Sequence, residues 1–217
     1  MQLTGVCRKW PRLSQPLGTT CAMMLIKQFP DITLDDTLFV FALEAEAGDV
    51  FADVNTVFTG IGKVNAAIAL TKAIAARRPR LIVNLGSAGS QRHGKGEVVC
   101  CTRFVQRDMD VTPLGFARYQ TPLSDIPVVL EHGAQIPGLA LETCGSGDSF
   151  EINHGDAPYD VVDMEAYVLA LIARGEGIPF VCLKYISDDA GSDAAQDWAV
   201  QVHLAAEAFR QVLFSQA

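Results

Sequence analysis

The stretch from Tyr159 to Asp189 constrains the fold more than any other part of this 217-residue chain. Its first half predicts a short strand at 161–162 that leads into an apolar helix over 166–174, which Gly175 ends. Its second half, 180–186, is mostly apolar, as expected for a central strand whose two faces are both covered. A strand, a helix and a second buried strand in succession indicate an α/β protein with parallel strands.

Acidic residues stand at the junctions of this predicted unit. Glu165 begins the helix, and Asp188 follows the buried strand together with Ser187 and Asp189. In open α/β sheets the ligand lies at the carboxyl ends of the strands, so we expect both acids at one rim of the sheet. Two carboxylates at one rim make a candidate active site.

The rest of the chain extends the same architecture over a single domain. Strands alternate with helices, and a chain of this length can bury one core. We therefore expect an α/β fold, a three-layer sandwich with a central twisted, mainly parallel mixed sheet. A glycine- and serine-rich turn over 86–90 is expected to break one strand. The expected elements are strands at 38–43, 54–58, 80–85, 98–105 and 139–143, a helix that starts at Glu44, and helices over 63–77 and 196–213.

The domain is expected to span 37–217, with 1–36 as an N-terminal extension. Residues 1–30 contain no Asp or Glu but do contain basic residues. This composition is typical of a targeting segment, yet the apolar core of a secretory signal is missing. We favour a poorly ordered or loosely docked extension, or a start codon assigned too early.

Charge and composition narrow the class of function. The net charge of −8 comes without a strong basic patch, which argues against nucleic acid as a partner. No run of 18 or more apolar residues is present, so no membrane-spanning helix is expected. The six cysteines form no C-x-x-C pair and the four histidines lack metal-ligand spacing, so we expect neither a disulfide framework nor a metal site. Reduced thiols in a cytoplasmic protein fit best, with no cofactor.

Three further features allow two interpretations each. The G-x-G at 60–62 either cradles a phosphate or allows close packing of strand and helix, and it is weak as a dinucleotide fingerprint. The 108–122 loop has enough apolar residues to need a second subunit or a ligand. Phe150 is either a core anchor or a platform for stacking.

Seven motifs occur in a specific order along the chain. They are ALEAE at 42–46, TGIGKVNAA at 59–67, NLGSAG at 84–89, DMDVT at 108–112, SGDSF at 146–150, VDMEA at 162–166 and ISD at 186–188. Together they resemble the nucleoside phosphorylase/nucleosidase superfamily, and within it the 5′-methylthioadenosine/S-adenosylhomocysteine nucleosidases. Each motif alone is weak, whereas the ordered set is a strong signal.

The resemblance implies catalytic roles for two acids. Asp188 is expected to protonate or hydrogen-bond N7 of the leaving purine, and Ser187 to orient it. Glu46 is expected to hold the attacking water, with Ser87 in the part of the pocket that faces this water. Because cleavage of an N-glycosidic bond leaves positive charge on the ribose and negative charge on the purine, acids are needed beside both.

The resemblance also implies the binding residues for a purine nucleoside. Glu165 and the backbone of Met164 are expected to hold the ribose hydroxyls. Phe150 is expected to stack on the base, and backbone groups near Glu151 to read its edge. A glutamate at 151 departs from the apolar residue expected there. This leaves open a nucleoside with a different 5′ group or a futalosine-like compound.

The partner that the resemblance implies is a second copy of the chain. In the family, the loop that contains Leu114 and Pro122 reaches across a dimer interface to the 5′ substituent, so the resemblance implies a homodimer.

The same scaffold can use phosphate in place of water, which needs fixed cations. Phosphorylase relatives have an arginine where this chain has Asn84, and the acids at 44–46 would repel phosphate. Hydrolysis is therefore favoured, although Arg103 and Arg107 could reverse that preference. A third interpretation is a non-catalytic nucleoside-binding relative, against which the three matched carboxylates argue.

Overall fold

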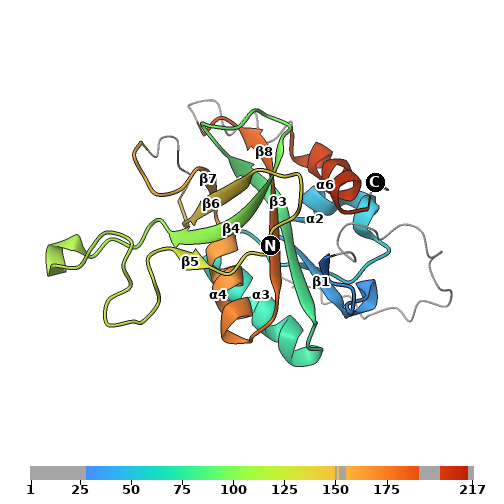
Figure 1. Ribbon diagram of the computed structural model, residues 1–217, viewed down its shortest axis with the longest axis horizontal. Coiled ribbons are helices and arrows are strands. Elements are labelled where there is room, and N and C mark those ends of the chain that lie inside the picture. Colours follow the sequence, from blue (N-terminus) through green and yellow to red (C-terminus); the bar gives the residue numbers. More distant parts are fainter. Residues whose placement is uncertain (1–27, 150, 152–154, 191–200, 215–217) are drawn as a thin grey trace, which may run out of the picture.

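The computed structural model describes residues 28–149, 151, 155–190 and 201–214 (Figure 1). The expected extension is therefore described only from Gln28 onward. Phe150 lies outside the described residues, and so does the first part of the helix expected over 196–213.

Strands and helices alternate along the described chain, as expected. The strands are β1 (Thr37–Phe41), β2 (Thr56–Phe58), β3 (Leu81–Gly89), β4 (Val98–Gln106), β5 (Leu130–Glu131), β6 (Leu141–Ser146), β7 (Val161–Asp163) and β8 (Phe180–Asp188). The α-helices are α2 (Glu44–Ala47), α3 (Lys63–Ala76), α4 (Ala166–Gly175) and α6 (Ala205–Phe214). Short 3-10 helices are η1 (Leu34–Asp36), η2 (Gly48–Phe51), η3 (Thr112–Leu114) and η4 (Val202–Leu204).

The described strands form one mixed sheet, with five parallel and three antiparallel pairings. β8 lies between β3, to which it is parallel, and β4, to which it is antiparallel. β4 pairs with β6, β6 with β7, and β7 with β3, so five strands close a ring. The prediction of a mainly parallel mixed sheet is confirmed, but no sequence pattern indicated the closed ring.

Helices cover both faces of the sheet, which makes the expected three layers (Figure 1). α3 and α4 pack on one face, and α6 with η2 packs on the other. In β1, Leu38 and Val40 belong to the α3–α4 side, whereas Phe39 and Phe41 belong to the α6 side. Because successive side chains of a strand point to opposite faces, a strand between two helical layers has to be apolar throughout.

The predicted break after residue 85 is wrong, because β3 continues to Gly89. Its parallel pairing with β8 passes through Gly86 and Ser87 and shifts register only between Ala88 and Gly89. The glycines are needed instead because side chains of other segments lie close to the β3 backbone. A Cβ on Gly86 would lie 3.4 Å from both the Glu46 Oε1 and Lys184 Nζ atoms, and one on Gly89 would lie 2.6 Å from Asp188 Oδ1.

Other boundaries differ by a few residues. β6 runs on past residue 143, where the expected strand ends, through Gly145 to Ser146. A Cβ on Gly145 would meet the ring of Tyr159 at 2.6 Å. The two-residue β5 was not predicted, because it has no pattern of its own and forms only by pairing with β4. No helix among the described residues has the length and apolar character needed to cross a bilayer.

Candidate active site

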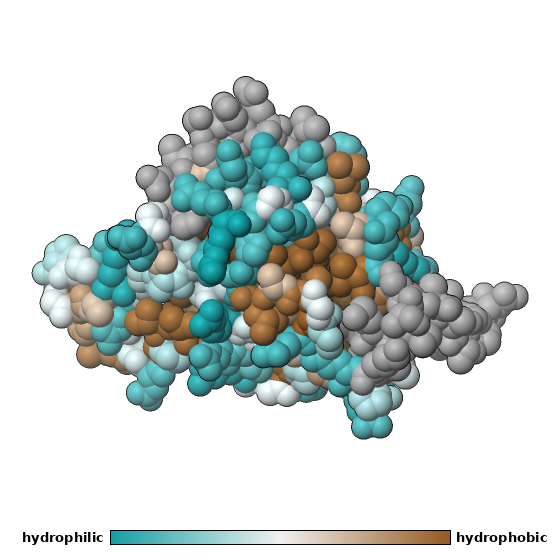
Figure 2. Space-filling view, turned by 45° about the horizontal axis from the view of Figure 1, so that its top comes forward, coloured by the Kyte–Doolittle hydropathy of each residue, from teal (hydrophilic) through white to brown (hydrophobic). Residues whose placement is uncertain are grey.

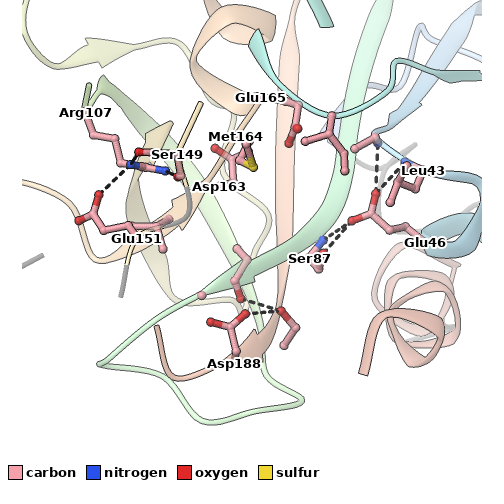
Figure 3. A pocket seen from close by; sticks show the side chains of 16 residues that line it. Leu43, Glu46, Ser87, Arg107, Ser149, Glu151, Asp163, Met164, Glu165 and Asp188 are labelled. Carbon is pink, nitrogen blue, oxygen red and sulfur yellow. Dashed lines mark hydrogen bonds and ion pairs between the residues drawn. The ribbon is translucent and has the colours of Figure 1, made fainter. Parts of the chain in front are cut away.

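One cavity of about 230 Å³ opens at the carboxyl ends of β3 and β8 (Figure 3). Its wall is completed by the start of α2, by the residues between β7 and α4, and by Ser149 and Glu151. This is the rim where ligands of α/β sheets bind. The lining residues are Ala42, Leu43, Glu46, Ile61, Ser87, Ala88, Gly89, Arg107, Ser149, Glu151, Val162, Asp163, Met164, Glu165, Ser187 and Asp188.

Glu46 is held in place by backbone and hydroxyl donors. Its Oε2 atom accepts hydrogen bonds from the Ala42 and Leu43 amides at 3.2 and 3.1 Å, because α2 begins directly after β1 and the side chain can reach back. Its Oε1 atom accepts hydrogen bonds from the Ser87 amide and hydroxyl, both at 2.8 Å. The residue is 3% exposed. Glu46 therefore has a fixed orientation at the cavity wall.

Glu165 lies next to a buried ion pair. Its Oε1 atom accepts a hydrogen bond from the Gly62 amide at 2.8 Å, which ties the start of α4 to the start of α3. Asp163 Oδ2 lies 2.8 Å from Lys184 Nζ, and the Ala166 amide donates to Asp163. All three ionisable side chains are buried.

The buried charges shift one another's pKa values. Burial raises the pKa of Glu165 to about 8, and the negative charge of Asp163 adds to this rise. Burial alone would raise the pKa of Asp163, but Lys184 lowers it below its ordinary value. Burial alone would lower the pKa of Lys184, but Asp163 holds it well above its ordinary value. At neutral pH the Asp163–Lys184 pair is charged, and most Glu165 side chains carry a proton.

Asp188 ends β8 and is 5% exposed. The Ser187 hydroxyl donates to its Oδ2 atom at 2.8 Å, and the Ala190 amide donates to its Oδ1 atom at 3.0 Å. Ala190 has a φ of 51°, a left-handed conformation that costs energy for a residue with a Cβ. The next residue, Asp189, is exposed and does not line the cavity.

The opposite wall carries a second ion pair. Arg107 Nη1 lies 2.9 Å from Glu151 Oε2, and the Tyr159 hydroxyl donates to Glu151 Oε1 at 3.0 Å. The Arg107 guanidinium also donates to the Gly147 carbonyl oxygen and the Ser149 hydroxyl, both at 3.1 Å. Figure 3 shows Arg107, Ser149 and Glu151 on one side of the cavity and Glu46 and Ser87 on the other. We call these the Glu151 side and the Glu46 side.

Most of the residues predicted for the site meet in this cavity. Leu114 and Pro122 do not line it, and Leu114 is 74% exposed in the loop with η3 that projects from the body (Figure 1). In Figure 2 this loop, at the left, carries apolar atoms, separate from a larger apolar area in the body. Phe150 lies outside the described residues. The predicted residues that line the cavity are Glu46, Ser87, Glu151, Met164, Glu165, Ser187 and Asp188.

The sequence indicated neither Asp163 nor Lys184 as part of the site, and it indicated Arg107 only as a cation that could favour phosphate. For Lys184 a signal was present, because a lysine inside an otherwise apolar strand is rarely buried without a carboxylate partner. No sequence pattern indicates the ion pair of Arg107 with Glu151, because the two residues lie far apart along the chain and meet only in the tertiary fold. Among the described residues, no group of three or more His, Cys, Asp or Glu side chains could hold a metal ion.

Comparison with known proteins agrees with the fold and the motifs. The family model of the phosphorylase superfamily matches residues 41–137 and 150–215. A 5′-methylthioadenosine/S-adenosylhomocysteine nucleosidase of Actinobacillus succinogenes is 33% identical over 170 residues, which is 69% of this chain and 74% of that protein. The similar match to a Marinomonas nucleosidase of the same name has 32% identity over 176 residues, 71% of this chain and 76% of that one.

Solved structures share the architecture at lower identity. The Helicobacter pylori 5′-methylthioadenosine/S-adenosylhomocysteine nucleosidase superposes with a TM-score of 0.72 and 19% identity, covering 82% of this chain and 95% of that one. The family model and the relatives together confirm the resemblance that the motifs indicated. The chain belongs to the phosphorylase superfamily.

Proposed function

We propose that the protein hydrolyses the N-glycosidic bond of a 5′-substituted adenine nucleoside of the methylthioadenosine or S-adenosylhomocysteine type, and releases adenine. The observation that carries this proposal is the convergence of Glu46, Glu165 and Asp188 on one cavity. The curated relatives with about one third identity are named for this activity.

The reaction needs charge stabilisation at both ends of the breaking bond. Asp188 donates a proton or a hydrogen bond to the purine, with Ser187 fixing the orientation of its carboxyl group. Glu46 holds the attacking water, because its carboxylate is rigid and faces the cavity. Glu165 and Met164 bind the ribose, where the Glu165 side chain hydrogen-bonds a ribose hydroxyl and, in its ionised form, stabilises positive charge on the sugar.

Water fits this cavity better than phosphate, because the backbone amides that could hold phosphate already have carboxylate partners. The Leu43 amide donates to Glu46 at 3.1 Å. At the start of α3, the Gly62 amide donates to Glu165 at 2.8 Å and the Lys63 amide donates to Asp148 at 2.7 Å. The G-x-G motif therefore offers these amides to acids of its own chain.

The cations near the cavity are also paired. Arg107 is bound to Glu151 and Lys184 to Asp163, while Arg103 is exposed on β4 and does not line the cavity. Asn84, at the position where phosphorylases carry an arginine, is 2% exposed and donates to the Val40 carbonyl oxygen. Five carboxyl groups line the cavity but only one guanidinium, and that guanidinium is already bound to Glu151, so the described lining offers little to hold a phosphate dianion.

Release of adenine from 5′-methylthioadenosine, measured with and without phosphate, tests the proposal. We expect equal rates in both buffers and loss of turnover in Asp188→Asn with the fold retained. Strict dependence on phosphate would instead assign the phosphorylase reaction. Thermal stabilisation by the nucleoside without release of adenine would assign a non-catalytic binding role.

The protein is further expected to act as a homodimer in the cytoplasm. Leu114 and Leu123 are 74% and 97% exposed in the η3 loop, and Ile61 at the cavity is 47% exposed. A second copy could cover this apolar surface and bring its own Leu114 and Pro122 to the 5′ substituent. Leu114→Asp should shift the mass in solution toward a monomer and raise the KM for methylthioadenosine. A wild-type monomer with full activity would contradict the dimer.

A further inference from the structure

The Arg107–Glu151 ion pair lines the cavity but takes no part in the reaction steps proposed above. Glu151 accepts one hydrogen bond on each oxygen, from Arg107 and from the Tyr159 hydroxyl. Its side chain is 16% exposed and lines the cavity. A carboxylate fixed at both oxygens still has one free lone pair on each, and these can accept further N–H donors.

Arg107 holds the Glu151 carboxylate in place through an ion pair. Its two terminal nitrogens contact Glu151, Ser149 and the Gly147 carbonyl oxygen, and its side chain is 4% exposed. A Cβ on Gly147 would lie 2.9 Å from the guanidinium carbon, so the turn is packed directly on the arginine. The ligand-reading group on this side is therefore Glu151, and Arg107 is a positioning residue.

The position of Glu151 in the cavity determines which part of a bound nucleoside would contact it. Figure 3 shows the Glu151 side across the cavity from Glu46 and Ser87, with Met164 and Glu165 between them. If water lies at Glu46 and ribose at Glu165, as proposed above, the base extends toward Glu151. An ionised carboxylate accepts hydrogen bonds and donates none, so it distinguishes an amine from a carbonyl oxygen on the base.

We propose that Glu151 is a specificity-determining residue, which accepts a hydrogen bond from the exocyclic amine of the leaving base and excludes bases with a carbonyl oxygen there. This inference rests on the proposed function. A carbonyl oxygen would face the carboxylate with no proton between them, and both groups would be desolvated without a partner. Sites built to bind an N–H group discriminate strongly against analogues without it, so we expect a preference of at least about a hundredfold.

The test compares kcat/KM for 5′-methylthioadenosine with that for 5′-methylthioinosine, in which a carbonyl replaces the amine. Wild-type protein should prefer the amino substrate strongly. In Glu151→Gln the side-chain amide can donate to a carbonyl oxygen, so the ratio of the two values should fall by about tenfold or more. Glu131→Gln, an exposed glutamate on β5 outside the cavity, is the matched control and should leave the ratio unchanged.

The ratio separates base recognition from a structural role. If Glu151 only holds the turn, Glu151→Gln lowers both values together and the ratio stays constant, which overturns the inference. Tyr159→Phe provides a second variant, because it keeps the ring and frees one Glu151 oxygen. It should lower the ratio in the same direction, and a constant ratio in a folded Tyr159→Phe protein also overturns the inference.

Failure of the inference differs from failure of the proposed function. If wild-type protein releases no base from either substrate, the proposed function is wrong. If wild-type protein releases both bases at similar rates, or prefers the carbonyl base, the nucleosidase activity stands and the role of Glu151 is wrong.

Discussion

The two sides of the cavity are held by different kinds of contact. On the Glu46 side, backbone amides in strands and at the starts of helices donate hydrogen bonds to the carboxylates. The Ser87 amide donates to Glu46 in this way, and the Gly62 amide donates to Glu165. On the Glu151 side, the reading group is held by the side chains of Arg107 and Tyr159. The fold itself therefore fixes the Glu46 side, whereas single substitutions can readjust the Glu151 side. The residues proposed for catalysis and the residue proposed for base specificity therefore lie on different sides of the cavity.

The largest effect is expected beneath the Glu46 side, at Lys184. Lys184→Met leaves Asp163 buried without its counter-ion, which should lower the free energy of unfolding by about 3–5 kcal/mol. Chemical denaturation measures this loss. The double variant Lys184→Met/Asp163→Asn removes the unpaired charge and should recover much of the loss. A double variant no more stable than the single one would show that the ion pair is not the cause.

Glu46→Gln should damage both activity and stability, because an amide cannot accept all the donors that the carboxylate binds. We expect kcat to fall by about 10²–10⁴-fold, the range for loss of a general base. The free energy of unfolding should fall by about 2 kcal/mol, as for lost hydrogen bonds to a charged group. Glu44→Gln, at an exposed position of the same helix, is the control. Equal effects of the two substitutions would remove Glu46 from the reaction.

Glu165 should make stability depend on pH. Its carboxyl keeps a proton in the folded state up to about pH 8, from an ordinary pKa of 4.5. The folded state therefore binds more protons than the unfolded state between these values, and this contribution to stability is lost as the pH rises toward 8. Glu165→Gln has no such proton to lose, so its stability relative to wild type should grow by about 1 kcal/mol per pH unit over this window.

Denaturation of both proteins at pH 5, 6.5 and 8 checks the sign. A difference that stays constant from pH 5 to pH 8 would mean that Glu165 is ionised throughout, and would contradict the electrostatic description of the Glu46 side.

The smallest effect is expected on the Glu151 side. Arg107→Lys keeps the positive charge but loses the planar set of donors, so Ser149 and Glu151 should be held less firmly. We expect a rise in KM of about tenfold with kcat largely kept, since lost hydrogen bonds of this kind cost about 1 kcal/mol each. Arg103→Lys, at an exposed position of β4 outside the cavity, is the control. A drop in kcat as large as that of Glu46→Gln would erase the distinction between the two sides.

The same distinction explains what the sequence could predict. Glu46, Glu165 and Asp188 stand beside strand ends and helix starts, so local pattern and the motifs together located them. Lys184 was read as part of an apolar strand, although its charge required a partner. Gly86 was read as a strand breaker, because the need for space beside Glu46 and Lys184 arises only from tertiary contacts.

The meeting of Arg107 and Glu151 could not be predicted, because it depends on how β4 and β6 pair. The closed ring of strands is a further case. The ring depends on β8 pairing with both β3 and β4. The sequence of an apolar strand does not indicate which strands it pairs with.

The identity of the nucleophile tests the central claim most directly. Methylthioadenosine should be turned over in water enriched in heavy oxygen, with phosphate present, and the sugar product analysed by mass spectrometry. We predict a free sugar that carries the heavy oxygen at C1, because Glu46 activates water and the nearby cations are already paired. A sugar phosphate without the label would contradict this account.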